Sequence, residues 1–396
     1  MAPTTNPESA SILIMNCGFT AEHYPIVSVR MPSIAPSFDA EPKATTKHTL
    51  CGYAWPDVTN ALIRAIGQAD MARSLRWSAE LICSDLGLGR LEATLLHAWS
   101  LHVGGAYPGW PRIWAYTIKQ LRSYWQKSGG DIKSVRNTPV VRQLVGEAVA
   151  ALVLSAKKPL SILPTAADCY KEAESMRQRL RAGGGVGEQL ACRRIWASGV
   201  DGLDLKTIGN EFEAALRSNQ VGRLLFWVIW IITLDGQTDA PQAKERGPAF
   251  LPVKQRKSII WFLVALIHEL ANESAFLPVD DRDAMFEALE LTWPKLGTKG
   301  RRDTIASLAL SVQEHNQRRT SLTLSGPAAP PPMTAIRNAI QKLDEIYSGI
   351  ANEARKFMLE RPVMAGLTAE AAAAARAPVK MNDMDKMALA FSLAFK

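Results

Sequence analysis

Lysine and arginine are the side chains in this sequence whose spacing most clearly suggests chemistry, and that chemistry is the binding of phosphate. Between residues 112 and 181 there are thirteen Lys/Arg against five Asp/Glu. Cations spaced along one surface hold a chain of phosphates without reading bases. We expect such a stripe on a helix over 110–127 and in the turn after it; a solvated basic surface is the alternative. The stripe comprises Arg112, Lys119, Arg122, Lys133 and Arg136.

Two smaller basic clusters stand just before expected helices. Cations at a helix N-terminus oppose the helix dipole, whereas a bound anion would make the same arrangement favourable. We therefore expect secondary anion sites there, with pairing to acidic residues elsewhere as the alternative. The first cluster, before a helix near 258, is Lys254, Arg256 and Lys257; the second, before a helix near 303, is Lys299, Arg301 and Arg302.

Signatures of catalysis are missing from the sequence. It contains no GxxxxGK[ST] loop, HExxH, GxSxG or CxxC pattern. His268-Glu269 has no second histidine four residues on, and the run Asp280-Asp281-Asp283 is expected to cap a helix. We expect a protein that is not an enzyme and that needs no metal or cofactor. An enzyme whose site is assembled from residues without a recognisable pattern ranks last.

The composition is that of a globular protein. The chain has 396 residues, a hydrophobic fraction of 47%, a charged fraction of 21% and a net charge of +8. Its longest apolar runs, Leu224–Leu234 and Ile259–Ile267, are shorter than the roughly 20 residues that span a bilayer. The five cysteines lack ligand spacing, and MAPTTNPESA lacks the pattern of a secretory signal. We expect a cytoplasmic, nuclear or virion protein without a membrane span, and not a secreted one.

Helical spacing of apolar residues dominates the chain from 55 to 320, which predicts an all-α fold. Short β-like runs occur only near the start, at Ser11–Met15 and Ile26–Val29. We expect an N-terminal arm (1–54), a first helical lobe (55–182), a second lobe (183–320), a Pro-rich linker (321–333) and a helical tail (334–396). The expected helices lie near 57–68, 69–83, 90–103, 110–127, 138–156, 165–182, 188–198, 205–219, 221–234, 254–273, 280–291, 302–319 and 334–359.

One internal similarity relates the two expected lobes. A shift of 150 residues aligns Asp57–Asp85 with Thr207–Asp235, and both segments contain Arg-x-Leu-x-Trp after a short polar break. A helical hairpin stacks well on a related neighbour. We therefore expect each lobe to begin with a similar hairpin; chance similarity between two amphipathic helices is the alternative.

The expected tail helix carries an apolar face with the alternating spacing of a coiled-coil seam. We expect this seam to contact a protein partner, a second copy of the chain or the body of the same chain. Its positions are Ile336, Ile340, Leu343, Tyr347, Ile350, Ala354 and Phe357.

The segment Asn60–Asp85, with Ala65-Ile66-Gly67-Gln68-Ala69-Asp70 and then Arg73-Ser74-Leu75-Arg76-Trp77, resembles part of a known family. It is similar to a helical hairpin in the C-terminal collar domain of clamp-loader-type AAA+ ATPases of the RarA/MgsA branch. The resemblance covers about 30 residues, or twice that with the second copy. It implies an oligomerising helical module. The ATPase domain is absent, so no nucleotide-binding residues carry over.

These features together predict a helical scaffold or adaptor that assembles with itself or with protein partners. Homo-oligomers and phosphate contacts to DNA or RNA are expected. The alternative is a structural component of a virion or nucleocapsid, in which the arm (1–54) and the tail (325–396) exchange between subunits.

Overall fold

The computed structural model describes residues 47–84, 87–165, 186–235, 237, 240–273, 277–318 and 330–360, all within one unit, residues 34–396. Every regular element in these ranges is a helix, so the predicted all-α fold is confirmed. The described helices include none long and apolar enough to cross a membrane. The two β-like runs, the helix expected at 165–182, most of the linker and the tail beyond 360 lie outside the described residues.

The chain's first hairpin is formed by α1 (Trp55–Gly67) and α2 (Met71–Cys83), which pack against each other. α1 begins two residues before the expected start at 57, because Pro56 occupies its first turn, where a missing N–H is harmless. α2 begins after Asp70, whose side chain accepts a hydrogen bond from the Arg73 N–H at 3.0 Å.

The second hairpin, α9 (Leu203–Arg217) and α10 (Val221–Leu234), repeats the turn of the first. Ala69 and Asn219, 150 residues apart, have φ of 55° and 60°. In each turn the next residue donates a 2.9 Å backbone hydrogen bond to an alanine carbonyl five positions earlier. A left-handed residue followed by a backbone hydrogen bond that spans five positions is the Schellman motif, which ends many helices. The two hairpins therefore share one turn geometry, as the aligned segments predict.

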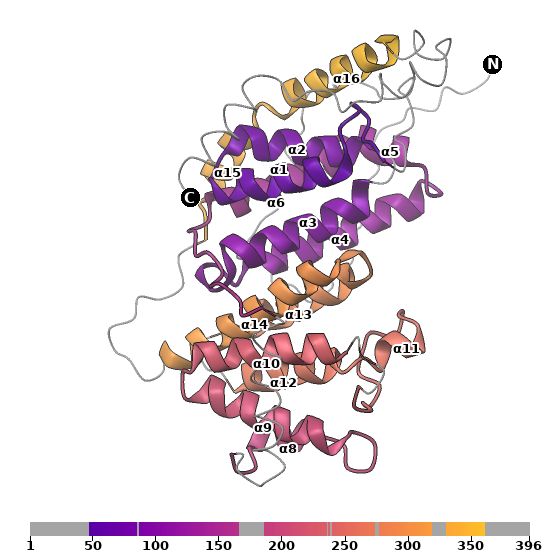
Figure 1. The fold of residues 1–396 in the computed structure, drawn as a ribbon. Coiled ribbons are helices and arrows are strands. Elements are labelled where there is room, and N and C mark those ends of the chain that lie inside the picture. Colours follow the sequence, from indigo (N-terminus) through magenta and orange to yellow (C-terminus); the bar gives the residue numbers. More distant parts are fainter. Residues whose placement is uncertain are drawn as a thin grey trace, which may run out of the picture. The chain divides into compact units, whose positions relative to one another are not determined.

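The region between the hairpins and the region after them pack together (Figure 1). α13 contacts α4, α3 and α12, and α14 contacts α3, α10 and α12. These contacts place residues near 300 beside residues near 90. The elements are α3 (Gly87–His102), η1 (Gly104–Ala106), α4 (Trp110–Lys127), α5 (Ile132–Asn137), α6 (Pro139–Leu154), α13 (Val279–Thr292), η2 (Trp293–Lys295) and α14 (Thr298–Arg318).

The single helix expected at 254–273 is instead two, α11 (Val253–Arg256) and α12 (Ile260–Asn272). Asp235, which follows α10, accepts hydrogen bonds from the Ser258 hydroxyl at 2.7 Å and the Ile259 N–H at 2.9 Å. Its carboxylate therefore starts α12 from outside the local sequence. The short α8 (Leu190–Ile195) packs on α9 and α12.

The expected tail helix is also two helices, α15 (Met333–Ile340) and α16 (Leu343–Glu360). α15 packs on α6, whereas α16 packs mainly on α2 (Figure 1). The break at Gln341 and Lys342 lets the chain follow first one helix and then the other.

A polar network fastens α16 to α2 and to the segment before α1. Glu80, which is completely buried, accepts hydrogen bonds from the Cys51 N–H at 3.0 Å and from Arg76 at 3.2 Å. Arg76 and the Tyr53 hydroxyl both donate to Glu353 of α16. Hydrogen bonds to buried charges are strong and directional, so this network fixes where α16 docks.

Candidate nucleic-acid interface

Two of the cations expected to form the α4 stripe are paired with carboxylates. Arg112 lies 3.5 Å from both Asp280 and Asp281. The Lys119 Nζ lies 2.5 Å from Glu287 Oε1. All three acids belong to α13, which packs against α4. These cations therefore join two helices, and most of their charge is already compensated.

Arg122 is engaged in the same region. Its Nη2 donates to Glu92 of α3 at 2.9 Å and to the Leu291 carbonyl of α13 at 2.6 Å. Burial raises the pKa of Glu92, and the Arg122 charge counteracts that rise. Arg122 thus compensates a largely buried carboxylate and one of the last carbonyls of α13, where a cation is favourable.

Arg136 is not a surface cation, which corrects the prediction that it contacts phosphate. Its side chain is 1% exposed, and Nη1 donates to the Cys83 carbonyl at 2.8 Å. Lys133 belongs to α5, but the described part of the structure does not include its side chain. The stripe is therefore a set of structural contacts at Arg112, Lys119, Arg122 and Arg136.

The cluster before α12 divides into one structural arginine and two exposed lysines. Arg256 donates to Glu245 at 2.6 Å and to the carbonyls of Ala249 and Leu251 at 2.9 Å each. Lys254 and Lys257 are exposed, and no described carboxylate lies within ion-pair distance of either. These two lysines remain available to a phosphate.

The cluster near 300 lies inside the first turn of α14 rather than before it, because that helix begins at Thr298. Arg302 pairs with the buried Asp303 at 2.9 Å. Arg301 donates to the Trp293 carbonyl at 3.1 Å and lies 4.4 Å from that ring's centroid, a cation–π contact. Lys299 is exposed and has no described carboxylate partner.

The structure adds two cations that the sequence patterns did not indicate. The packing of α3 on η2 brings Lys295 across Gly89, where an added Cβ would lie 3.0 Å from the lysine Cε. Next to it, the guanidinium of Arg90 lies 4.9 Å from the Trp55 ring centroid. Both side chains are exposed, and no described carboxylate lies within ion-pair distance of either. The Lys295 charge does act on Glu92, where it counteracts the rise that burial causes in the pKa of that carboxyl group. They are isolated in sequence, so only tertiary packing reveals them.

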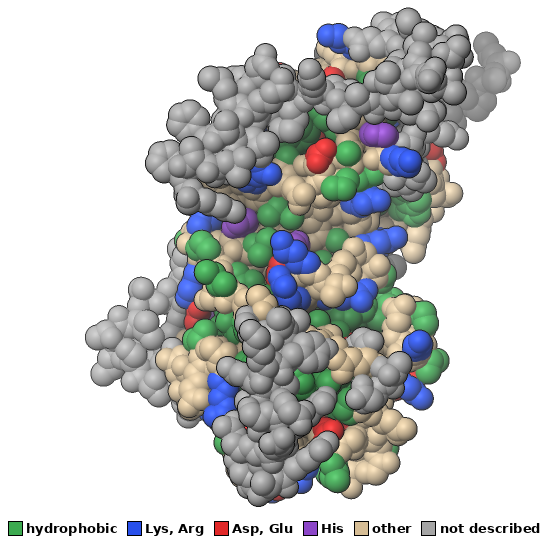
Figure 2. Space-filling model, viewed as in Figure 1, with side chains coloured by type: hydrophobic (Ala, Val, Ile, Leu, Met, Phe, Trp, Pro, Cys, Tyr) green, Lys and Arg blue, Asp and Glu red, His purple; other side chains and the backbone are tan. Residues whose placement is uncertain are grey.

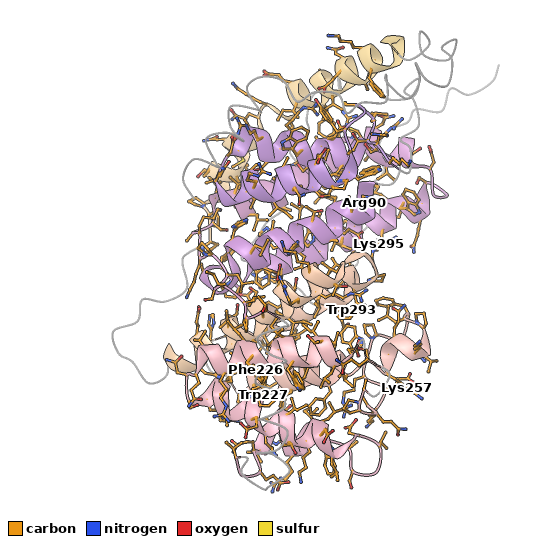
Figure 3. All side chains as sticks on the ribbon, viewed as in Figure 1. Arg90, Phe226, Trp227, Lys257, Trp293 and Lys295 are labelled. Carbon is orange, nitrogen blue, oxygen red and sulfur yellow. The ribbon has the colours of Figure 1, made fainter. Side chains whose placement is uncertain are left out.

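We define the basic face as seven cations on or directly next to α3, α11, η2 and α14. In the view shared by Figures 2 and 3, Arg90, Lys295 and Lys257 are labelled on it, and further Lys and Arg side chains appear there. The acids nearby are engaged already: Asp303 with His97 and Arg302, and Asp235 at the start of α12. The members of the basic face are Arg90, Lys254, Lys257, Lys295, Lys299, Arg301 and Arg302.

The seam expected to bind a protein partner is buried against the same chain. Its apolar positions are the contacts of α15 and α16 with α6 and α2. At the far end, the Phe357 ring lies over Gly52, where an added Cβ would be 2.5 Å from its Cε2. The fully buried members are Ile336, Ile340, Leu343, Tyr347, Ile350 and Ala354. This face is therefore not free for a partner while α15 and α16 remain docked.

The described residues contain no group of three or more His, Cys, Asp or Glu placed to hold a metal ion. Comparisons with protein families, with curated proteins and with solved structures find no match to this chain. The similarity of Asn60–Asp85 to clamp-loader collar domains stays a prediction.

Proposed function

We propose that this protein is a non-catalytic helical scaffold that binds nucleic acid without sequence preference through its basic face. The observation that supports the proposal is a group of exposed cations with no described carboxylate within ion-pair distance: Arg90, Lys295, Lys299, Lys254 and Lys257. They come from helices distant in sequence, and the packing of α3, η2 and α14 supports three of them. Lysine and arginine on a folded surface neutralise phosphates and release the condensed counterions.

The contrast with the α4 stripe strengthens this assignment. Arg112 and Lys119 must leave carboxylates of α13 before they can bind a phosphate. Lys295 and Lys299 have no described ion pair to break, and the only carboxylate on which the Lys295 charge is described to act is Glu92, which is already paired with Arg122. For equal charge, the basic face therefore binds a polyanion at lower free-energy cost.

Assembly with protein partners, as a scaffold requires, must use a surface other than the docked seam. An alternative is a structural component whose copies exchange α15 and α16. The docking site on α6 and α2 favours it, because the same contacts would form in trans if these helices moved to a neighbouring copy. Light scattering over a concentration series separates the two: large particles that grow with concentration support the structural component.

The test of nucleic-acid binding compares two charge-neutralised variants with the unmodified protein. The first carries Arg90→Gln, Lys295→Gln and Lys299→Gln; the control carries Arg112→Gln and Lys119→Gln. Affinity for labelled DNA and RNA is measured by fluorescence anisotropy at low salt, with circular dichroism to check folding. We expect the first variant to lose at least about tenfold in affinity and the control about twofold or less. A larger loss in the control would contradict the assignment.

A further inference from the structure

The loop from Gly247 to Lys257 presents an exposed apolar tip that is followed by two exposed lysines. Phe250 and Val253 are 57% and 51% exposed, although single exposed apolar residues of this size are common on protein surfaces. Lys254 and Lys257 follow these two residues in sequence and are exposed as well. The combination of an exposed aromatic ring with unpaired cations is the unusual feature.

This loop is held firmly by its own contacts. The N–H groups of Arg246 and Gly247 both donate to the Arg256 carbonyl, at 3.0 and 3.1 Å, which closes the base of the loop. The Arg256 guanidinium fills the interior by binding the carbonyls of Ala249 and Leu251. Leu251 is the loop's buried apolar anchor. Phe250 is therefore exposed on a loop whose backbone is held by internal hydrogen bonds.

Packed tryptophans connect the loop to the rest of the basic face. An added Cβ on Gly247 would lie 2.7 Å from Trp261 Nε1, so the base of the loop stands on Trp261. Trp261 packs on Trp293 with ring centroids 4.6 Å apart, and Trp293 carries Arg301 on its ring. Figure 3 labels Lys257, Trp293 and Lys295 on the same face. A strand bound at Lys295 can thus continue towards Phe250.

We propose that the loop makes the nucleic-acid site selective for single strands, with the Phe250 ring stacking on an unpaired base and Lys254 and Lys257 holding the adjoining phosphates. This rests on the proposed binding of nucleic acid. Stacking on an aromatic side chain accepts any base, which suits binding without sequence preference. A duplex cannot use the ring, because its base faces are already stacked on each other. An anionic membrane surface would also attract this tip, but the continuity with the cations at Lys295 and Arg90 favours a strand.

The test measures affinity for a labelled single-stranded oligonucleotide and for a duplex of the same sequence at one salt concentration. The variants are Phe250→Ala and Phe250→Trp, and the control is Leu203→Ala, another exposed apolar residue at 74% exposure. We expect Phe250→Ala to weaken single-strand binding about tenfold and duplex binding by less than about twofold. Phe250→Trp should keep the preference, and Leu203→Ala should change neither affinity.

Equal losses on both nucleic acids, or no loss on the single strand, would overturn the stacking role. If the unmodified protein binds neither form at low salt, the proposed function itself fails, which is a separate result. Flotation with vesicles that contain phosphatidylserine completes the test. Vesicle binding that Phe250→Ala abolishes, with single-strand affinity unchanged, would assign the loop to a membrane surface instead.

Discussion

The docking of the C-terminal helices depends on the absence of a side chain at Gly146. A Cβ added there would lie 2.6 Å from Leu343 Cδ1 and 3.4 Å from Ile340 Cγ2, and the first distance is shorter than real Cβ contacts allow. Gly146→Ala must therefore displace Leu343 or shift α15 and α16 on α6. This makes Gly146 and Leu343 a pair whose substitutions should interact.

The magnitudes follow from the two opposing effects at this position. Overpacking a core costs about 1–3 kcal/mol, while alanine gains about 1 kcal/mol over glycine inside a helix. Gly146→Ala should therefore lower the free energy of unfolding by about 0–2 kcal/mol. Leu343→Ala, which removes a buried side chain, should cost about 2–5 kcal/mol. In the double variant the methyl group added at position 146 occupies space that Leu343 vacates, so the cost should fall short of the sum by at least about 1 kcal/mol.

The assay is urea denaturation of the four proteins, followed by tryptophan fluorescence and circular dichroism together. Gly349→Ala in α16 is the matched control, because an added Cβ there meets no atom within 4 Å. The control should gain about 0.5–1 kcal/mol from helix propensity alone. The reasoning would be refuted if Gly146→Ala stabilised the protein as much as the control. Additivity of Gly146→Ala and Leu343→Ala within about 0.5 kcal/mol would refute it as well.

Three further predictions concern the hairpin turns, a buried arginine and a half-buried histidine. In denaturant titrations, Ala69→Gly should stabilise the protein by about 1 kcal/mol, and Asn219→Gly by less, because a left-handed backbone strains alanine more than asparagine. A loss of stability in either variant would contradict the turn geometry. In the same assay Arg136→Ala should cost about 2–4 kcal/mol, since it removes a buried charge-assisted hydrogen bond, whereas a surface arginine would cost under about 0.5. The pKa of His102 is lowered by burial and by the nearby Lys157 charge. As the pH falls through about 6.5, His102 therefore binds a proton in the unfolded chain but not yet in the folded chain. Stability is therefore lost as the pH falls below about 6.5, and His102→Gln should flatten this dependence between about pH 5 and 7; an unchanged profile would show that another group is responsible.

The elements with strong apolar periodicity were predictable from the sequence, and so was the common hairpin. Ala69 and the Ala65 carbonyl lie within one local turn, and Asn219 and the Ala215 carbonyl lie within another, so local chemistry decides both turns. The boundaries that tertiary contacts set were not predictable. Asp235 starts α12 across 23 residues, and the tail divides into α15, which packs on α6, and α16, which packs mainly on α2.

The candidate site was harder to predict because charge pairing is a long-range property. The spacing of Arg112 and Lys119 correctly indicated one side of α4, but their partners on α13 lie about 170 residues away in sequence. Arg90 and Lys295 have no local pattern at all, and they become neighbours only through the packing of α3 on η2. Sequence spacing identifies exposed-looking cations, whereas the structure separates the free ones from the paired ones.

The central claim is that unpaired cations on the basic face bind phosphates. The most direct measurement is the slope of log affinity against log salt concentration for single-stranded DNA, with the unmodified protein and the Arg90→Gln, Lys295→Gln and Lys299→Gln triple variant. Each phosphate contact contributes about 0.7 to this slope on a single strand. We predict a steep slope for the unmodified protein that becomes shallower by about 2 in the variant. Equal slopes for the two proteins, or no binding at low salt, would contradict the account.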